Sequence, residues 1–491
     1  MDYPSPTLDD AKPQRSFGSA VRSAVIWRSG SQIVAQLVQW AATFLVIRIL
    51  DPRDYGLFAM CQVVLSFLAL LNGHGLASGV IQAREVEPRA VRQLFGMLIL
   101  LNVSLAGVQF LLAPLVAAYF RQPMVGDMLR VQALLYLAVP FIALPQAILS
   151  RAMDFRQQAR ANITASIASA ATALTGALAG WGVWTLVAAP AAMYGVRAVM
   201  MTWGARSLVW PLFDFRGSGW LARYGGVMAV SQLFWFVLTQ ADVLIAGRFF
   251  DAATVGLYTT ALFFTQIFQN KVVPPLNEVA FSAYARLQDQ PGAVGRAFLG
   301  SAGAIMAAAL PVYLGMAVTA EPLVLLALGD HWAGAAPAVR LLACAMPFMT
   351  LYVLMPPATD AIGRPGIGVR AAMIGAGVLP IACAVGVRWG LTGLAAAWLI
   401  AWPVMLAVLA SRALPAIEVG TRELARAIAP AVQAAVAMAV VLLMVDGRLP
   451  PFAAAARLGV LVATGACVYA SWMLIFSRPT VRTLWAMVRP R

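Results

Sequence analysis

The sequence contains little charge for its length. Of its 491 residues, 11% are Asp, Glu, Lys or Arg, whereas a soluble globular chain has about 25%. Hydrophobic residues make up 61% and form long continuous runs instead of short alternating segments. This pattern excludes a soluble enzyme, a disordered chain, a fibrous protein and a membrane β-barrel. It predicts a polytopic helical membrane protein.

Cysteine and histidine are also scarce, with four and two residues respectively. The cysteines lie far apart in apolar segments and form no CxxC pair: Cys61, Cys344, Cys383 and Cys467. Neither a metal cluster nor a disulfide framework can be built from such a set. The Gly-Lys-Ser/Thr signature of a phosphate-binding loop does not occur. The sequence therefore predicts no catalytic residue, no metal and no cofactor.

Apolar runs recur along the chain, each close to the roughly 20 residues that cross a bilayer. We count about fourteen such spans, at residues 24–48, 55–80, 94–120, 129–149, 160–179, 182–204, 223–248, 254–276, 297–319, 335–358, 367–387, 391–411, 424–445 and 452–476. The predicted fold class is an all-α polytopic membrane protein with about fourteen transmembrane helices.

Acidic residues are outnumbered by basic ones, 20 against 35, which gives a net charge of +15. Most of the basic residues are arginines in short loops between apolar runs, so we interpret them as charge that sets topology and not as a nucleic-acid site. Most fall in the predicted cytoplasmic segments when both termini are placed inside. The arginine- and alanine-rich composition is typical of a high-GC bacterium. We therefore expect a multi-pass protein of a bacterial inner membrane, with both termini cytoplasmic and no nucleic-acid partner.

The two halves of the chain share an internal repeat. Ser31-Gln32, Arg48, Asp51 and Gly56-Leu57 recur 200 positions later without a gap, as Ser231-Gln232, Arg248, Asp251 and Gly256-Leu257. Spans 1–6 thus correspond to spans 7–12 in the same order, which predicts two pseudo-symmetric six-helix bundles and two extra C-terminal helices. The expected domains are a cytoplasmic segment (1–22), an N-terminal bundle (23–205), a C-terminal bundle (222–412), appended helices 13 and 14 (423–476) and a cytoplasmic tail (477–491).

A stripe of polar residues follows span 1. The stripe covers about 80° of the helix surface and consists of Arg28, Gln32, Gln36, Gln39 and Thr43. Polar groups facing lipid are costly, so the stripe is expected to face the bundle interior or water. Two interpretations remain: hydrogen bonding between helices, or the wall of a cavity that binds a polar ligand. Arg28 could also extend to the cytoplasmic interface.

Span 7 repeats this pattern, with Gln232 and Thr239 at the positions of Gln32 and Gln39. Asp242 is the only acid well inside an apolar run. An acid within the membrane is a candidate for ion coupling, although a structural pair with Arg248 or with an arginine from another span is an equal alternative.

Span 8 carries further amide groups and a lysine. Gln266 and Asn270 lie on one broad face, and Lys271 lies further round near the cytoplasmic end. We expect Gln266, Asn270 and Lys271 to contribute to substrate binding. Lys271 could instead mark only the membrane interface.

Several loop motifs resemble those of the Wzx-type polysaccharide flippases, in the polysaccharide transporter branch of the multidrug/oligosaccharidyl-lipid/polysaccharide exporter superfamily. The motifs occur in the right order across about residues 22–412. They are Arg48-Ile-Leu-Asp51-Pro-Arg-Asp-Tyr-Gly56-Leu57, Arg151-Ala-Met-Asp154-Phe155-Arg156, Gln240-Ala-Asp242-Val-Leu-Ile-Ala-Gly247-Arg248, Asn277-Glu-Val-Ala-Phe281-Ser282 and Ala361-Ile-Gly363-Arg364-Pro365. Ser282 departs from the family, where proline is common.

This resemblance implies a flippase without covalent chemistry. It would move undecaprenyl-diphosphate-linked oligosaccharide from the inner to the outer leaflet by alternating access, for exopolysaccharide, capsule or O-antigen (lipopolysaccharide) assembly. Membrane lipid, H+ or Na+ as coupling ion and a polysaccharide polymerase complex are the other expected partners. Two alternatives remain: a cation-coupled multidrug exporter of the same superfamily, and a membrane polysaccharide polymerase or glycosyltransferase.

Overall fold

The computed structural model describes residues 17–69, 88–152, 154–205, 207–214, 236–450 and 453–476. In these ranges the regular structure is entirely helical, which confirms the all-α fold class. Nine helical stretches within the described ranges are long and apolar enough to cross a membrane. One of them, Gly366–Ala416, holds two of the predicted spans joined by a short turn. The predicted total of about fourteen spans stays a prediction.

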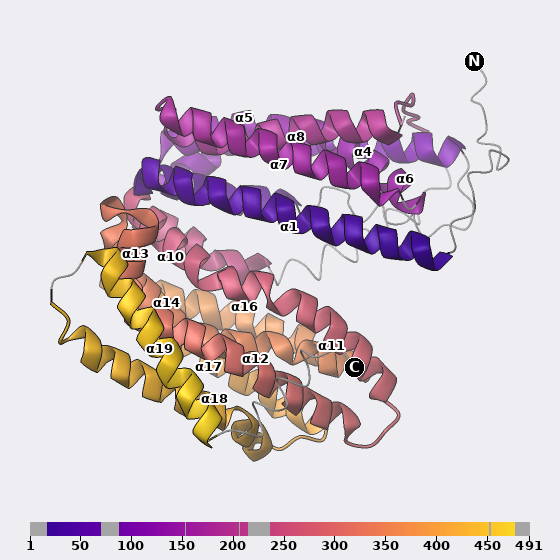
Figure 1. Cartoon of the computed structure of the whole chain (residues 1–491). Coiled ribbons are helices and arrows are strands. Elements are labelled where there is room, and N and C mark those ends of the chain that lie inside the picture. The colour runs from indigo at the N-terminus through magenta and orange to yellow at the C-terminus, as the bar shows by residue number, and fades with distance from the viewer. Residues whose placement is uncertain are drawn as a thin grey trace. The chain divides into compact units, whose positions relative to one another are not determined.

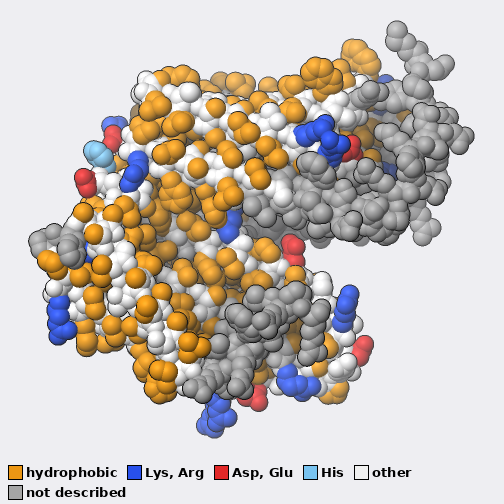
Figure 2. Space-filling view, viewed as in Figure 1, with side chains coloured by type: hydrophobic (Ala, Val, Ile, Leu, Met, Phe, Trp, Pro, Cys, Tyr) orange, Lys and Arg blue, Asp and Glu red, His pale blue; other side chains and the backbone are white. Residues whose placement is uncertain are grey.

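Apolar side chains cover the visible face of the described helices, and charged side chains gather near the edges of that face (Figure 2). Large hydrophobic residues such as Leu111 and Leu115 are highly exposed. In a soluble protein such a surface would be a liability, whereas a bilayer solvates it.

The chain forms two compact units. The first unit comprises Met1–Ile49, Leu68–Leu115 and Gly126–Ala229. Its described helices run side by side in Figure 1 and are α1 (Phe17–Ile49), α4 (Pro88–Phe120), α5 (Pro123–Ala133), α6 (Pro140–Arg151), α7 (Phe155–Leu178) and α8 (Val183–Ala205).

Helix α7 packs closely against its neighbours in the first unit because one of its faces is lined by residues with small side chains. Ala161, Ala165, Ser169, Ala173 and Ala177 recur every four residues and are all buried. Small residues at this spacing allow neighbouring membrane helices to approach closely, which supplies van der Waals contact where lipid removes the hydrophobic driving force. Both α1 and α8 pack extensively on α7.

The second unit comprises Leu50–Phe67, Val116–Val125 and Val230–Arg491. Residues 236–249 form a helix here. The other helices of this unit are α2 (Pro52–Ala69), α10 (Ala252–Lys271), α11 (Val273–Leu287), α12 (Ala293–Val318), α13 (Ala320–Leu328), α14 (Ala336–Leu354), α15 (Pro356–Ala361), α16 (Gly366–Gly386), α17 (Gly390–Ala416), α18 (Thr421–Asp446) and α19 (Ala454–Phe476). Helices α12, α14 and α17 form its centre, and α16 packs along α17. Of the expected domain boundaries, residue 205 is the end of α8, whereas residue 222 lies outside the described residues; both boundaries stay predictions.

The C-terminal helices α18 and α19 pack on α12 through a shared apolar cluster that includes Met306, Leu310 and Ala434. Arg457 at the start of α19 donates to both carboxylate oxygens of Asp446 at the end of α18, at 2.7 and 2.9 Å. Such a bidentate pair fixes the geometry of the two helices more strongly than a single contact.

The internal repeat is visible in the backbone. The first helix of each half ends at residue 49 or 249, and the next begins at Pro52 or Ala252. The aspartate in the second break, Asp251, accepts a hydrogen bond from the Thr254 N–H at 3.1 Å and so caps α10. Equal helix breaks at equal offsets agree with the duplicated sequence.

Glycines allow the two repeated helix starts to approach each other within the second unit. A methyl group at Gly56 would collide with the carbonyl oxygen of Ala252, and one at Gly256 would collide with the carbonyl oxygen of Pro52. The contact is reciprocal, as a two-fold relation between the repeats requires. Only glycine permits this approach of backbone to backbone.

The hairpin of α16 and α17 offers a direct test of topology. Arg388 lies at its tip, between the two helices, and Arg412 lies at its other end, in the last turns of α17. An alkaline-phosphatase fusion after Arg388 is expected to be active and one after Arg412 inactive, because the loop charges place these sites outside and inside. Equal activity of the two fusions, at equal protein levels, would contradict the predicted orientation.

Candidate functional site

The described part of the span-1 stripe is half-buried. Gln36, Gln39 and Thr43 are partly buried on α1, whereas Val34 and Leu37 of the same helix are exposed. The Thr43 hydroxyl donates to the carbonyl oxygen of Gln39 at 2.8 Å, so it is satisfied within its own helix. Apolar neighbours on α1, such as Val38 and Trp40, are equally half-buried, so the expectation that the stripe faces away from lipid stays a prediction.

The side chains of three predicted binding residues lie outside the described part of the structure. Arg28 and Gln32 belong to α1, but their side chains lie outside the described part of the structure, and Gln232 lies outside the described residues altogether. Thr239 is described: it is partly buried, and its hydroxyl donates to the carbonyl oxygen of Phe236 at 3.3 Å. Their roles in substrate binding stay predictions.

Asp242 occupies a closed polar site within the second unit. Asp242 lies on the helix of residues 236–249 and is fully buried. One carboxylate oxygen accepts from the hydroxyl of Tyr258 on α10 at 2.7 Å, and the other accepts from the backbone N–H of Val243 at 2.8 Å. Tyr258 is itself fully buried. The carboxylate thus binds two donors in a place that water does not reach in this structure.

No cation neutralises Asp242 among the described residues. None of the ion pairs of these residues involves it. The alternative partner, Arg248, instead donates to the carbonyl oxygen of Tyr119 at 2.9 Å and lies 5.6 Å from the centre of the Tyr119 ring. An acid that is buried without a paired cation is costly, and such acids in membranes are candidates for function.

Two further helices complete the surroundings of this site. The thiol of Cys383, on α16, is close enough to Asp242 for an electrostatic interaction. Trp398, on α17, lies beside the Tyr258 hydroxyl, and its indole N–H has no acceptor within hydrogen-bond geometry. The carboxylate itself accepts its hydrogen bonds from the Tyr258 hydroxyl and the Val243 N–H. We find no group of three or more metal-ligating side chains in the described residues.

The amides of α10 divide into two sets. Gln269 is buried and accepts from the Thr350 hydroxyl of α14 at 3.0 Å, so it joins two helices. Gln266 is half-buried, whereas Asn270 and Lys271 are exposed at the end of α10. Gln266 lies roughly 12 Å along α10 from Tyr258, and Asn270 and Lys271 lie further along the helix, so the structure does not bring these three predicted binding residues together with Asp242.

Sequence reasoning missed two polar groups. Tyr258 was not singled out because a tyrosine in an apolar run gives no signal of its own; its importance follows only from the contact with Asp242. Arg197 lies within α8, where its guanidinium donates to the Gln146 side chain at 3.4 Å and its Nε has no partner. Its position inside an apolar run was a signal that the sequence did offer.

Comparisons with solved structures identify the fold. The lipid II flippase MurJ in an inward closed conformation matches with a TM-score of 0.74 at 11% identity, covering 93% of this chain and 100% of that one. An inward-facing multidrug resistance transporter of the MATE family matches with a TM-score of 0.58 at 14% identity, covering 80% and 99%. At these identities the likeness concerns the fold alone.

Sequence comparisons find curated proteins that are similar to part of this chain. The succinoglycan biosynthesis transport protein ExoT of Rhizobium meliloti (strain 1021) is 25% identical over 320 residues, or 65% of each chain. The lipopolysaccharide biosynthesis protein WzxC of Escherichia coli (strain K12) is 21% identical over 301 residues, or 60% of each chain. The similar region thus spans less than two thirds of the length of these relatives.

A family profile described as "Polysaccharide biosynthesis protein" matches residues 45–337, which is more than half of the chain. That region includes the repeated helix breaks, Asp242 and Tyr258. In line with its resemblance to Wzx-type polysaccharide flippases, the chain belongs to this family of polysaccharide biosynthesis proteins.

Proposed function

We propose that this protein is a lipid-linked oligosaccharide flippase of a bacterial inner membrane. Its substrate is an undecaprenyl-diphosphate-linked oligosaccharide, which crosses from the inner to the outer leaflet by alternating access and serves exopolysaccharide, capsule or O-antigen assembly. The observation that carries the proposal is the family match over residues 45–337. The MurJ-like fold supports it, because the solved protein of that fold is named as a lipid II flippase.

The substrate needs cationic and amide groups along its path. Guanidinium groups bind phosphate oxygens in a bidentate way, and amides donate to and accept from sugar hydroxyls. The chain offers both kinds within its apolar spans, at Arg28, Gln32, Gln36, Gln39, Gln232, Thr239, Gln266, Asn270 and Lys271. The half-buried state of Gln36, Gln39 and Gln266 supports this role, because these amides keep some exposure inside apolar helices.

Asp242 supplies the coupling in this proposal, and a proton suits its surroundings better than Na+. A sodium ion needs several oxygen acceptors, whereas the groups that bind the Asp242 carboxylate are donors, the Tyr258 hydroxyl and the Val243 N–H. A proton needs a single acceptor. Binding it would neutralise the carboxylate and allow the hydrogen bond with Tyr258 to reverse its direction. Such a change would alter the packing between α10 and the helix of residues 236–249.

Deleting the gene and analysing the lipids tests the function. A strain without this flippase is expected to accumulate finished lipid-linked repeat units in the inner leaflet and to export no polymer. Accumulation of single repeat units in the outer leaflet would instead identify a polymerase. Normal polymer together with increased drug sensitivity would identify a multidrug exporter. Either of these two results would overturn the proposal.

Arg28 provides a test of the binding path. Arg28→Ala is expected to lower polymer export at least about tenfold, because one charge-assisted contact to a phosphate contributes about that much. Arg28→Lys should restore only part of it, since an ammonium group lacks the planar fork. Polymer per cell is measured against the amount of protein in the membrane. Wild-type export by a well-expressed Arg28→Ala variant would remove Arg28 from the path.

A further inference from the structure

The α16–α17 hairpin carries a groove at the end opposite to Arg388. Two depressions of about 310 and 330 Å³ adjoin there and share Ile367, Arg370 and Arg412 among their lining residues. We call their union the arginine groove; its outer part is lined by Arg364, Arg370, Ser411 and Arg412, and its inner part by Ile367, Met373, Ile374 and Val408.

The outer part of the arginine groove is strongly cationic. Arg364 precedes α16, Arg370 lies in its first turns, and Arg412 lies in the last turns of the antiparallel α17. All three arginines are exposed. Within the described residues, none of their guanidinium groups forms an ion pair, and no acidic side chain lines the groove. Three like charges without a counter-charge repel one another, so an anion between them would be stabilising.

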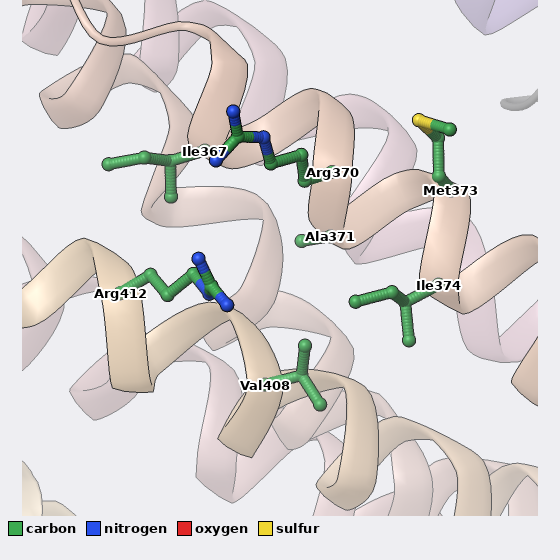
Figure 3. A pocket seen from close by; sticks show the side chains of 7 residues that line it. All are labelled: Ile367, Arg370, Ala371, Met373, Ile374, Val408 and Arg412. Atoms are coloured by element: carbon green, nitrogen blue, oxygen red, sulfur yellow. The ribbon is translucent and has the colours of Figure 1, made fainter.

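The inner part of the groove is apolar and continues along the helices. Met373 and Ile374 follow Arg370 by about one turn of α16, and both are about half exposed, at 48% and 46%. Figure 3 shows the guanidinium groups of Arg370 and Arg412 near Ile367, while Met373 and Ile374 lie further along α16. Moving along the groove, a ligand would therefore meet phosphate-binding groups first and hydrocarbon next.

We propose that the arginine groove binds an anionic glycerophospholipid of the surrounding membrane. Its phosphate would lie between Arg370 and Arg412, where planar forks can bind two oxygens each, and an acyl chain would lie along Ile374 and Val408. Basic pockets between membrane helices on the cytoplasmic side, where the loop charges place this end, are suited to anionic headgroups. The lipid would thereby bridge α16 and α17.

The lining favours a phospholipid over the polyprenyl diphosphate of a lipid-linked sugar. Both would offer a phosphate and a hydrocarbon chain. A glycan also needs amide or aromatic walls for its hydroxyls and rings, whereas the uncharged polar side chain of the groove is Ser411 alone. The proposal does not depend on the transported substrate.

Retention of lipid by the purified full chain tests this site. The protein is placed in nanodiscs of phosphatidylcholine that contain a small fraction of phosphatidylglycerol, and the bound lipid is counted by native mass spectrometry after release. Arg370→Gln with Arg412→Gln is expected to lower retained phosphatidylglycerol at least about tenfold, as loss of charge-assisted contacts predicts. The matched control is Arg422→Gln with Arg426→Gln on α18, which removes two exposed arginines outside the groove and should change retention less than about twofold.

One further variant and a comparison lipid separate specific binding from general charge and from misfolding. Ile374→Trp fills the inner part without changing charge and should also lower phosphatidylglycerol retention, while retention of the phosphatidylcholine of the same nanodiscs should not respond to any variant. Equal losses in the α18 control would overturn the proposal, because general surface charge would then explain binding. Preferential displacement of phosphatidylglycerol by undecaprenyl phosphate would also overturn it and assign the groove to the polyprenyl carrier.

Discussion

Asp242→Asn is expected to reduce polymer export to nearly the level of a deletion strain, while the protein still accumulates in the membrane. Asparagine has almost the same shape: its single side-chain oxygen can accept from the Val243 N–H, and its amide nitrogen can donate to the Tyr258 oxygen, in the places where the carboxylate oxygens now accept at 2.8 and 2.7 Å. Because the shape is kept, the variant should still fold. Because an amide does not exchange a proton in this way, a transport cycle that requires the site to alternate between charged and neutral forms should stop.

Three further variants define what this result means. Asp242→Glu should keep part of the activity, and Tyr258→Phe should lower export less than Asp242→Asn because it removes the partner but not the acid. Asp251→Asn is the matched control: this aspartate caps α10 from an exposed position, and asparagine caps equally well. Export that falls only in proportion to protein level would instead indicate that Asp242 has a structural role.

Gly56→Val and Gly256→Val are each expected to destabilise the protein by at least about 3 kcal/mol, so that little folded protein remains. The side chain at either position would enter a backbone carbonyl, of Ala252 or of Pro52, and backbone cannot move aside as a flexible side chain can. Fluorescence-detected gel filtration and thermal unfolding in detergent measure the loss. Because the contact is reciprocal, the two variants should behave alike.

The control for these substitutions is another helical glycine. Gly377 in α16 has open space where its Cβ would lie, so Gly377→Val changes helix propensity without creating a collision. It should yield nearly normal amounts of folded protein. Normal folding of the Gly56 and Gly256 variants would show that the two repeated helix starts do not approach each other as closely as described.

Hydropathy and the repeat predicted the helices well because both depend on local sequence. The apolar run at 367–387 coincides with α16 (Gly366–Gly386) to within one residue at each end, and the duplicated motif places helix breaks before Pro52 and Ala252. A helix in lipid must satisfy its own backbone and be apolar outside, so composition alone identifies it. The same argument says nothing about which helices pack together.

The sequence does not predict which polar side chains contact other helices, because these contacts depend on tertiary packing. Gln266 and Gln269 are the same residue type on one helix, yet only Gln269 meets Thr350 of α14 and becomes part of the structure. The hydrogen bond from Tyr258 to Asp242 likewise joins two helices and has no local signature. A periodic pattern predicts that a face is polar, whereas its neighbours decide whether the polar group is free to bind a ligand.

Transport by the purified protein tests the central claim most directly. The chain is reconstituted into proteoliposomes that contain a fluorescent polyprenyl-diphosphate oligosaccharide, and the fraction of label protected from an external quencher is followed over time. The account predicts rapid exchange between leaflets with the wild type, and exchange at the rate of empty liposomes with Asp242→Asn. No exchange by folded wild-type protein, under either direction of a proton gradient, would contradict it.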